Sequence, residues 1–194
     1  MNLSLNVGFI SYICMLLQRY KMLRKVFIIV VLLLVGNSLS AKMAYKDILD
    51  TYNPNTEKGL IYIDKQEMTL TLFSSEGELL MEYPIACGRN LGHKKRAGDN
   101  KTPEGVFYVQ QIQDASKWGH DFKDGKGFIK HAYGPWFIRL KTGFSGIGIH
   151  GTHDPDSIGT RATEGCIRLN NENLEKLQPL IDIGMTVVIG PEKQ

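Results

Sequence analysis

Short apolar segments separated by polar turns dominate the chain from residue 60 onward. Residues 68–73, with the sequence MTLTLF, alternate apolar and polar side chains, which is typical of a strand with one buried face. Residues 60–63 and 79–86 flank this segment across short turns, so the three segments predict a meander of hairpins. Further strands are expected at residues 106–109, 136–140, 147–150 and 185–189.

A single helix is expected among these strands. Leu174, Leu177 and Ile181 recur at helical spacing, and one of the two asparagines at 170–171 can cap the first turn. Residues 117–127 hold three glycines and show no periodicity, so they are predicted to form an exposed loop. The pattern as a whole predicts a mostly β domain with one covering helix.

The N-terminal residues have the three-part pattern of an export signal. A basic start at residues 22–25 precedes an unbroken apolar run at 26–35 and small residues at 38–40. The apolar run is shorter than the roughly 20 residues that a membrane-spanning helix needs. We therefore expect a cleaved leader whose translation begins at Met22. An uncleaved anchor that also uses the apolar residues 7–17 is the alternative.

These signals divide the chain into three parts: a leader over residues 1–41, a polar linker over 42–57 and one domain over 58–194. The net charge is only +3, and the densest basic run is KKR at residues 94–96. Such a weak charge gives no sign of a nucleic-acid partner. Contact with a membrane is expected only through the leader, if it stays uncleaved.

Residues 147–169 concentrate the groups that could carry chemistry. Cys166 needs a nearby base, because a free thiol with a pKa of about 8.5 is mostly protonated at neutral pH. His150 ends an apolar strand, and the loop that follows it returns the chain to Cys166. Closing a loop of this length is easy, since closure entropy grows slowly with length. The spacing therefore predicts Cys166 as nucleophile and His150 as general base.

The residues around Cys166 suggest how a substrate would be held. Gly165 lacks a Cβ, so an acyl group can approach the backbone there. The amides of Gly165 and Cys166 are predicted to form an oxyanion hole. In an extended segment Arg168 points to the same side as Cys166 and could bind a substrate carboxylate.

Other interpretations of the same residues remain open. His150, His153 and Cys166 could hold zinc, although a fourth ligand is not evident. Cys166 could form a disulfide with Cys87 in an oxidising compartment, or Glu164 could replace His150 as the base. The isolated histidines are expected to have no part in the chemistry: His93, His120 and His131.

Three motifs in this region resemble the active-site signature of L,D-transpeptidase catalytic domains. They are HGT at residues 150–152, SIG at 157–159 and TEGCIRL at 163–169. The similarity continues upstream through residues 89–107 and 133–137, and it covers residues 60–189. The combination of the histidine and cysteine motifs at this spacing is a specific signal, whereas either motif alone is weak.

The resemblance implies a β-sandwich with a small capping helix, and it implies the reaction. Cys166 would attack the peptide bond between the third and fourth residues of a peptidoglycan stem peptide and form a thioester. His150 would move the protons, with its tautomer fixed by the carbonyl of Gly151. An amine of a second stem would then give a 3-3 crosslink, whereas water would give carboxypeptidase activity.

The resemblance also implies the setting of the reaction. We expect a monomer in the periplasm or cell wall that uses no metal and no organic cofactor. Substrate contacts are expected from Tyr133, Trp136, Thr163 and Arg168. A domain that binds the cell wall without catalysis, with Cys87 and Cys166 bridged, is the alternative.

One departure from the family pattern lies next to the nucleophile. Many members carry Ser-His before the Gly-Cys pair, where this chain has Thr163 and Glu164. Thr163 keeps the hydroxyl, but Glu164 adds a negative charge that opposes thiolate formation at Cys166. Glu164 is expected to pair with Arg161 or Arg168.

Overall fold

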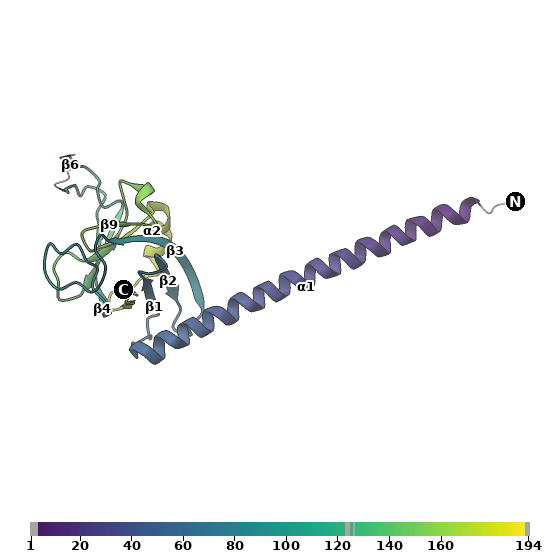
Figure 1. Ribbon diagram of the computed structural model, residues 1–194, viewed down its shortest axis with the longest axis horizontal. Coiled ribbons are helices and arrows are strands. Elements are labelled where there is room, and N and C mark those ends of the chain that lie inside the picture. Colours follow the sequence, from purple (N-terminus) through teal and green to yellow (C-terminus); the bar gives the residue numbers. More distant parts are fainter. Residues whose placement is uncertain (1–3, 123–124, 126, 193–194) are drawn as a thin grey trace. The chain divides into compact units, whose positions relative to one another are not determined.

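The computed structural model describes residues 4–122, 125 and 127–192 (Figure 1). The chain divides into two compact units, Met1–Met43 and Ala44–Gln194. Helix α1 (Ser4–Tyr52) makes up the described part of the first unit and continues into the second. In the described part of the chain, no helix carries an apolar stretch long enough to cross a membrane.

Parts of the expected leader and domain lie outside the described residues, namely residues 1–3 and 193–194. The side chains of the small residues 38–40 are also outside them. Export and cleavage of the leader therefore stay predictions.

The end of α1 packs on the β domain, although residues 42–57 were expected to be a linker. The buried side chain of Ile48 contacts Leu60, Phe73 and Val188 in a small apolar cluster. The ring centroid of Tyr45 lies 5.1 Å from that of Phe73. Tyr52, at the end of α1, also packs against this cluster. Polar residues separate these few apolar side chains and explain why the segment has the composition of a linker.

In the described part of the second unit, nine strands form one sheet, in the order β10-β8-β7-β4-β11-β1-β2-β3-β9. The predicted hairpins are confirmed, because β1, β2 and β3 pair antiparallel in chain order. The strands are β1 (Leu60–Asp64), β2 (Thr69–Phe73), β3 (Leu79–Gly88), β4 (Gly105–Asp114), β7 (Trp136–Lys141), β8 (Gly148–His150), β9 (Arg161–Thr163), β10 (Ile167–Leu169) and β11 (Thr186–Ile189).

Strand β10 closes the sheet on itself. It pairs parallel with β8 and antiparallel with β3, which are far apart in the strand order. The sheet therefore curves around an apolar core, and the expectation of a mostly β, sandwich-like domain is confirmed. Helix α2 (Asn171–Leu177) covers this core with the buried side chains of Leu174 and Leu177, as the helical spacing predicted.

The segment predicted as an exposed loop, residues 117–127, contains part of a short hairpin. Strand β5 (His120–Asp121) pairs antiparallel with β6 (Phe128–Ile129), and β6 projects outward from the domain (Figure 1). Three residues of this segment, 123, 124 and 126, lie outside the described part. The hairpin positions His120 next to the residues described below.

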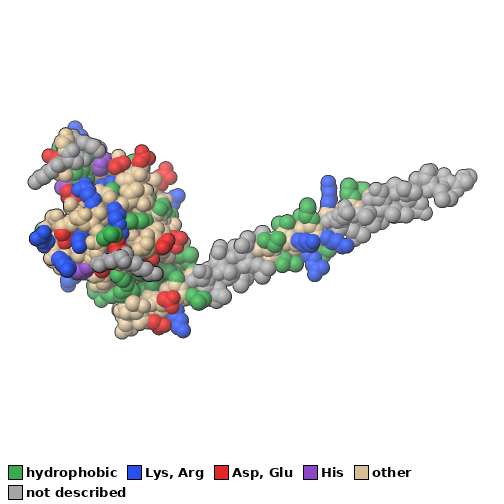
Figure 2. Space-filling model, in the orientation of Figure 1, with side chains coloured by type: hydrophobic (Ala, Val, Ile, Leu, Met, Phe, Trp, Pro, Cys, Tyr) green, Lys and Arg blue, Asp and Glu red, His purple; other side chains and the backbone are tan. Residues whose placement is uncertain are grey.

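Acidic and basic side chains are interspersed on the domain surface that Figure 2 shows. Lys94, the first residue of the basic run at 94–96, is buried, and its Nζ donates to Asp99 Oδ1 at 2.8 Å. Interspersed charge of this kind offers no continuous basic surface on the face that is visible.

Candidate active site

Strand pairing brings the two ends of the 147–169 stretch together. Strands β8 and β10 lie side by side, with Ile149 opposite Ile167 and His150 opposite Arg168. Residues that pair across strands share a face of the sheet, and Cys166 lies two positions before Arg168. Cys166, His150 and Arg168 therefore belong to the same region of one sheet face.

His150 is a buried imidazole with a defined tautomer. Its Nδ1 lies 2.6 Å from the carbonyl oxygen of Gly151, so Nδ1–H donates and Nε2 is left as the acceptor. The ring of Phe137 stacks on the imidazole, with 5.6 Å between the ring centroids. The ring of Tyr133 meets the imidazole edge-on, with 4.9 Å between the centroids. Burial lowers the pKa of His150 from 6.5 to about 3, and Arg168 adds to the effect, so the ring is neutral at neutral pH.

Cys166 carries a half-buried thiol that is held in its protonated form. Its Sγ donates to the carbonyl oxygen of Gly146 at 3.0 Å. Burial raises the pKa of Cys166 to about 11, against an opposing hydrogen bond from the backbone of Gly148. Among the described residues, no hydrogen bond joins this thiol to His150. In the resting site both the thiol and the imidazole are therefore neutral, and the thiol must turn from Gly146 to give up its proton.

Thr163 fixes the turn that presents the nucleophile. Its buried hydroxyl donates to the carbonyl oxygen of Cys166 at 2.7 Å and accepts from the amide of Gly165 at 3.1 Å. Gly165 has φ 136°, and a Cβ there would lie 2.6 Å from the carbonyl oxygen of Lys101. Only glycine fits this position without a shift of the backbone.

This arrangement changes two of the expected roles. The amide of Gly165 already donates to Thr163, so the amide of Cys166 is the remaining donor of the expected oxyanion pair. Thr163 was expected to contact substrate, but it is buried and both of its hydrogen bonds lie within the turn. It acts on Cys166 through the backbone.

Arg168 lies deeper than a carboxylate-binding arginine at a surface. Its side chain is only 4% exposed, and its Nη1 donates to Ser157 Oγ at 2.7 Å. Asp154 Oδ2 lies 3.8 Å from the same nitrogen. The buried Nε of Arg168 has no hydrogen-bond partner in the part of the chain that the structure describes. The guanidinium thus anchors the loop after β8 and keeps one donor unused.

Tyr133 and Trp136 were both expected to contact substrate, and the structure separates them. Tyr133 lies against His150, and burial raises the pKa of its hydroxyl to about 12. Trp136 precedes Phe137 in β7, and neighbouring residues of a strand point to opposite faces. Because Phe137 stacks on His150, Trp136 packs instead against the apolar core. Phe137 is the residue of this strand that contacts the site, and the register that places it there could not be read from the sequence.

Glu164 has a different partner from those expected. Its Oε2 lies 3.6 Å from His120 Nε2, whereas Arg161 pairs with Glu192. His120 was expected to have no part in the site, yet its ring lies 5.8 Å from that of Tyr133. Only the fold reveals this contact, because β5 is distant from the cysteine motif in the sequence.

The two cysteines of the domain are free thiols, so the expected disulfide alternative is not present in the structure. Cys87 is fully buried in β3, with its Sγ 3.7 Å from Met68 Sδ.

His153, which was considered as a zinc ligand together with His150, has other contacts. Its ring stacks on Phe122 at 5.3 Å, and its Nδ1 lies 3.3 Å from the carbonyl oxygen of Ala132.

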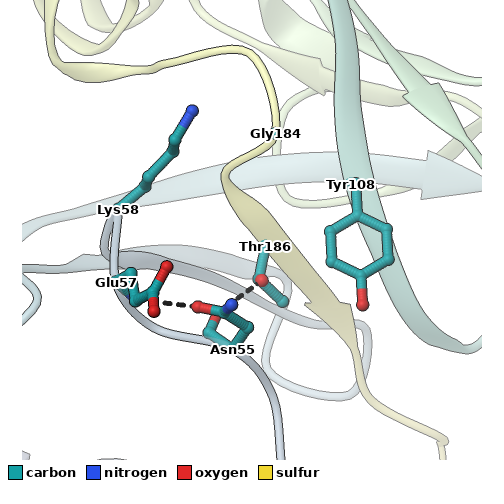
Figure 3. Close-up of a pocket in the computed structure, with 6 residues that line it drawn as sticks. All are labelled: Asn55, Glu57, Lys58, Tyr108, Gly184 and Thr186. Carbon is teal, nitrogen blue, oxygen red and sulfur yellow. Dashed lines mark hydrogen bonds between the residues drawn. The ribbon is translucent and has the colours of Figure 1, made fainter.

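A second polar depression shares no residue with this cluster. Figure 3 shows its lining, in which Thr186 Oγ1 donates to the carbonyl oxygen of Asn55 at 2.5 Å. Lys58 Nζ donates to the carbonyl oxygen of Ile183 at 2.8 Å. The residues that line it are Asn55, Glu57, Lys58, Tyr108, Gly184 and Thr186. Asn55 bonds to both Glu57 and Thr186, and the lining contains neither a cysteine nor a histidine.

The fold and the site define a β-rich domain in which a cysteine and a histidine share a sheet face. Residues 58–189 match the model of the YkuD family, described as the L,D-transpeptidase catalytic domain. The chain belongs to this family, whose members act on peptidoglycan peptides.

Similar proteins support this assignment. The chain is 31% identical over 139 residues to YkuD of Bacillus licheniformis, a candidate L,D-transpeptidase, which covers 72% of this chain and 70% of that protein. Identity to YkuD of Bacillus subtilis is also 31%, over 62% of this chain and 59% of that protein.

Solved structures show the same fold. The cell shape determining protein Pgp2 of Campylobacter jejuni matches with a TM-score of 0.53 and 25% identity, over 77% of this chain and 54% of that one. The catalytic domain of the Enterococcus faecium L,D-transpeptidase matches with a TM-score of 0.50 and 21% identity, over 69% of this chain and 97% of that one.

Proposed function

We propose that this chain is an exported cysteine L,D-transpeptidase that forms 3-3 crosslinks between peptidoglycan stem peptides. The observation that supports it most directly is the fixed tautomer of His150. Because Nδ1–H donates to Gly151, Nε2 is free to accept a proton from Cys166.

The neutral resting state implies how the first step proceeds. A separate thiolate is disfavoured at neutral pH, since burial raises the pKa of Cys166 and lowers that of His150. The proton therefore passes from Sγ to Nε2 as the sulfur attacks the carbonyl carbon of the third stem residue. The amide of Cys166 stabilises the oxyanion, and His150 then returns the proton to the leaving D-residue.

In the second step the amine of another stem attacks the thioester. The C–N bond forms, the C–S bond breaks, and His150 takes a proton from the attacking nitrogen and passes it to the departing sulfur. Water in place of the amine gives a trimmed tripeptide, which is the carboxypeptidase alternative. A wall-binding role without catalysis required a bridge between Cys87 and Cys166, and both are free thiols.

A substitution of the nucleophile tests the proposal. With purified tetrapeptide stems, wild-type protein is expected to give a crosslinked dimer by mass, and Cys166→Ala is expected to give none while its thermal unfolding is unchanged. Cys87→Ala is the matched control, because it removes the other thiol of the domain and should keep activity. Turnover by Cys166→Ala would contradict the mechanism.

The proposal of export rests on the leader and on where the domain begins. Cleavage after residue 41 would leave Tyr45 and Ile48 with the domain, where they pack against Phe73. N-terminal sequencing of protein from the cell-envelope fraction should give a first residue close to 42. A first residue of Met1 in that fraction would contradict cleavage and favour an uncleaved anchor.

A further inference from the structure

Glu164 carries an exposed carboxylate near the nucleophile. It lies two residues before Cys166, and its side chain is 48% exposed. Its Oε2 is 3.6 Å from Nε2 of His120, which is itself 34% exposed. The ring of His120 contacts Tyr133, and the ring of Tyr133 contacts His150. A continuous series of contacts therefore links this carboxylate to the base.

The charge of Glu164 reaches the reacting sulfur. It contributes, after burial, to the raised pKa of Cys166 and to the raised pKa of Tyr133. A negative charge in this position opposes the development of a thiolate. Glu164 therefore hinders the first half of the reaction, in which the sulfur attacks the donor peptide.

The same charge has the opposite effect on the second half. An aliphatic amine has a pKa of about 10.4, so an amine acceptor arrives at neutral pH as an ammonium ion. Water, the competing acceptor, carries no charge. A carboxylate beside the thioester attracts the ammonium and leaves the concentration of water unchanged.

We propose that Glu164, oriented by His120, makes the thioester on Cys166 select a cationic amine over water. This proposal rests on the proposed function. The ammonium loses one proton to solvent before attack. As the C–N bond forms and the C–S bond breaks, a second proton passes from the nitrogen to the sulfur. The products are an amide and the free thiol, so the reaction needs no further reactant.

The test measures the two halves of the reaction separately in the full chain. A tetrapeptide stem whose side-chain amine is acetylated can donate but cannot accept, so the early rise in the acylated mass of the intact protein reports thioester formation without transfer to an amine. An unmodified tetrapeptide stem reports the ratio of crosslinked dimer to trimmed tripeptide. Glu164→Gln should form the thioester at least as fast as wild type. Its ratio of dimer to tripeptide should fall about two- to fivefold, as expected for the loss of a partly exposed ion pair.

Three comparisons distinguish this role from a structural one. Glu164→Asp should restore part of the ratio, and Glu175→Gln, which removes an exposed charge on α2, should leave it unchanged. Raising the ionic strength should lower the wild-type ratio, because salt screens the attraction. A wild-type ratio in Glu164→Gln would overturn the inference alone. A wild-type protein that forms no thioester would overturn the proposed function, and the inference with it.

Discussion

In the part of the chain that the structure describes, the ring of His150 bonds to a backbone carbonyl. It is 3% exposed, and its Nδ1 bonds to a neutral carbonyl of Gly151. The aromatic rings of Phe137 and Tyr133 cover it. Such an environment favours the neutral form of the ring, and a neutral imidazole can act as a base. The same environment makes the protonated form of the ring costly in free energy.

This cost predicts a pH dependence of folding. Below pH 6.5 the unfolded chain protonates His150, whereas the folded protein keeps it neutral down to about pH 3. Stability is therefore fully present above pH 6.5 and is lost as the pH falls toward 3. We expect this residue to account for roughly 3–5 kcal/mol of the loss. Urea unfolding at pH 7 and pH 4 should show a smaller loss in His150→Gln than in wild type.

A second histidine provides the control for this measurement. His120→Gln removes a histidine that is partly exposed, and its stability is measured at the same two pH values. Equal losses in wild type and His150→Gln would contradict the role given to burial.

Residues that act through their own neighbours in the chain were predictable from the sequence. Gly151 follows His150 directly, so the contact between its carbonyl and the ring needs no knowledge of the fold. The pairing of Glu164 with His120 depends on where the β5–β6 hairpin lies, and the sequence does not specify this. The prediction named Trp136 where Phe137 contacts the site, and the cause is similar. A shift of one residue in the register of a strand moves its side chains to the opposite face.

At the scale of elements, the turn between β9 and β10 determines where the sulfur points. Thr163 ends β9, and its hydroxyl closes the turn by two hydrogen bonds before β10 begins. The turn also packs closely on the loop before β4, since Gly165 approaches the carbonyl oxygen of Lys101 in that loop. Neither strand exceeds three residues, so the turn depends strongly on this hydroxyl.

Removal of that hydroxyl should therefore weaken both the fold and the reaction. Thr163→Val keeps the shape of the side chain but leaves the amide of Gly165 without its acceptor. An unsatisfied buried polar group costs about 1–3 kcal/mol. Urea unfolding should show a loss of this size, and the rate of thioester formation should fall at least tenfold. Thr163→Ser, which keeps the hydroxyl, should lie close to wild type, and an equally active Thr163→Val would contradict the role of the turn.

The strands and α2 could be predicted because their signals are periodic and local. Alternation identified β2, and the spacing of Leu174 and Leu177 identified α2. The closure of the sheet could not be predicted, because β10 pairs with β8 and β3 through contacts between distant segments. The end of α1 was missed for a related reason, since few apolar residues mark the face that packs on the sheet.

At the scale of the whole molecule, one buried ionic cluster joins parts of the domain that are distant in sequence. Lys65, in the turn after β1, is only 1% exposed, and its Nζ lies 2.6 Å from Glu104 and 2.9 Å from Glu192. Arg161 of β9 forms an ion pair with the same Glu192. The cluster therefore ties the C-terminal segment after β11 to the β1–β2 turn, to β9 and to the loop before β4.

The same cluster supports the loop that packs against the active-site turn. Glu192 Oε1 accepts from the amide of Gly92 at 2.9 Å, and Lys65 Nζ lies 3.5 Å from the carbonyl oxygen of that residue. Further along this loop, Lys101 contacts the turn at Gly165. The C-terminal segment thus stabilises, through the loop, the backbone beside Cys166.

The cost of breaking the cluster is a prediction for the molecule as a whole. Lys65→Met would remove the cation that Glu104 bonds to and would leave Glu192 with Arg161 alone, in a site with little solvent. Removing one partner of a buried ion pair costs about 3–5 kcal/mol, because the remaining charge has lost its solvation and its partner. Urea unfolding should show a loss of this size in Lys65→Met. The matched control, Lys176→Met, changes an exposed lysine on α2 and should stay within about 0.5 kcal/mol of wild type. Adding Glu104→Gln to Lys65→Met should recover part of the loss, since it removes one of the stranded charges. If Lys65→Met were as stable as wild type, the cluster would not be what holds the C-terminal segment in place.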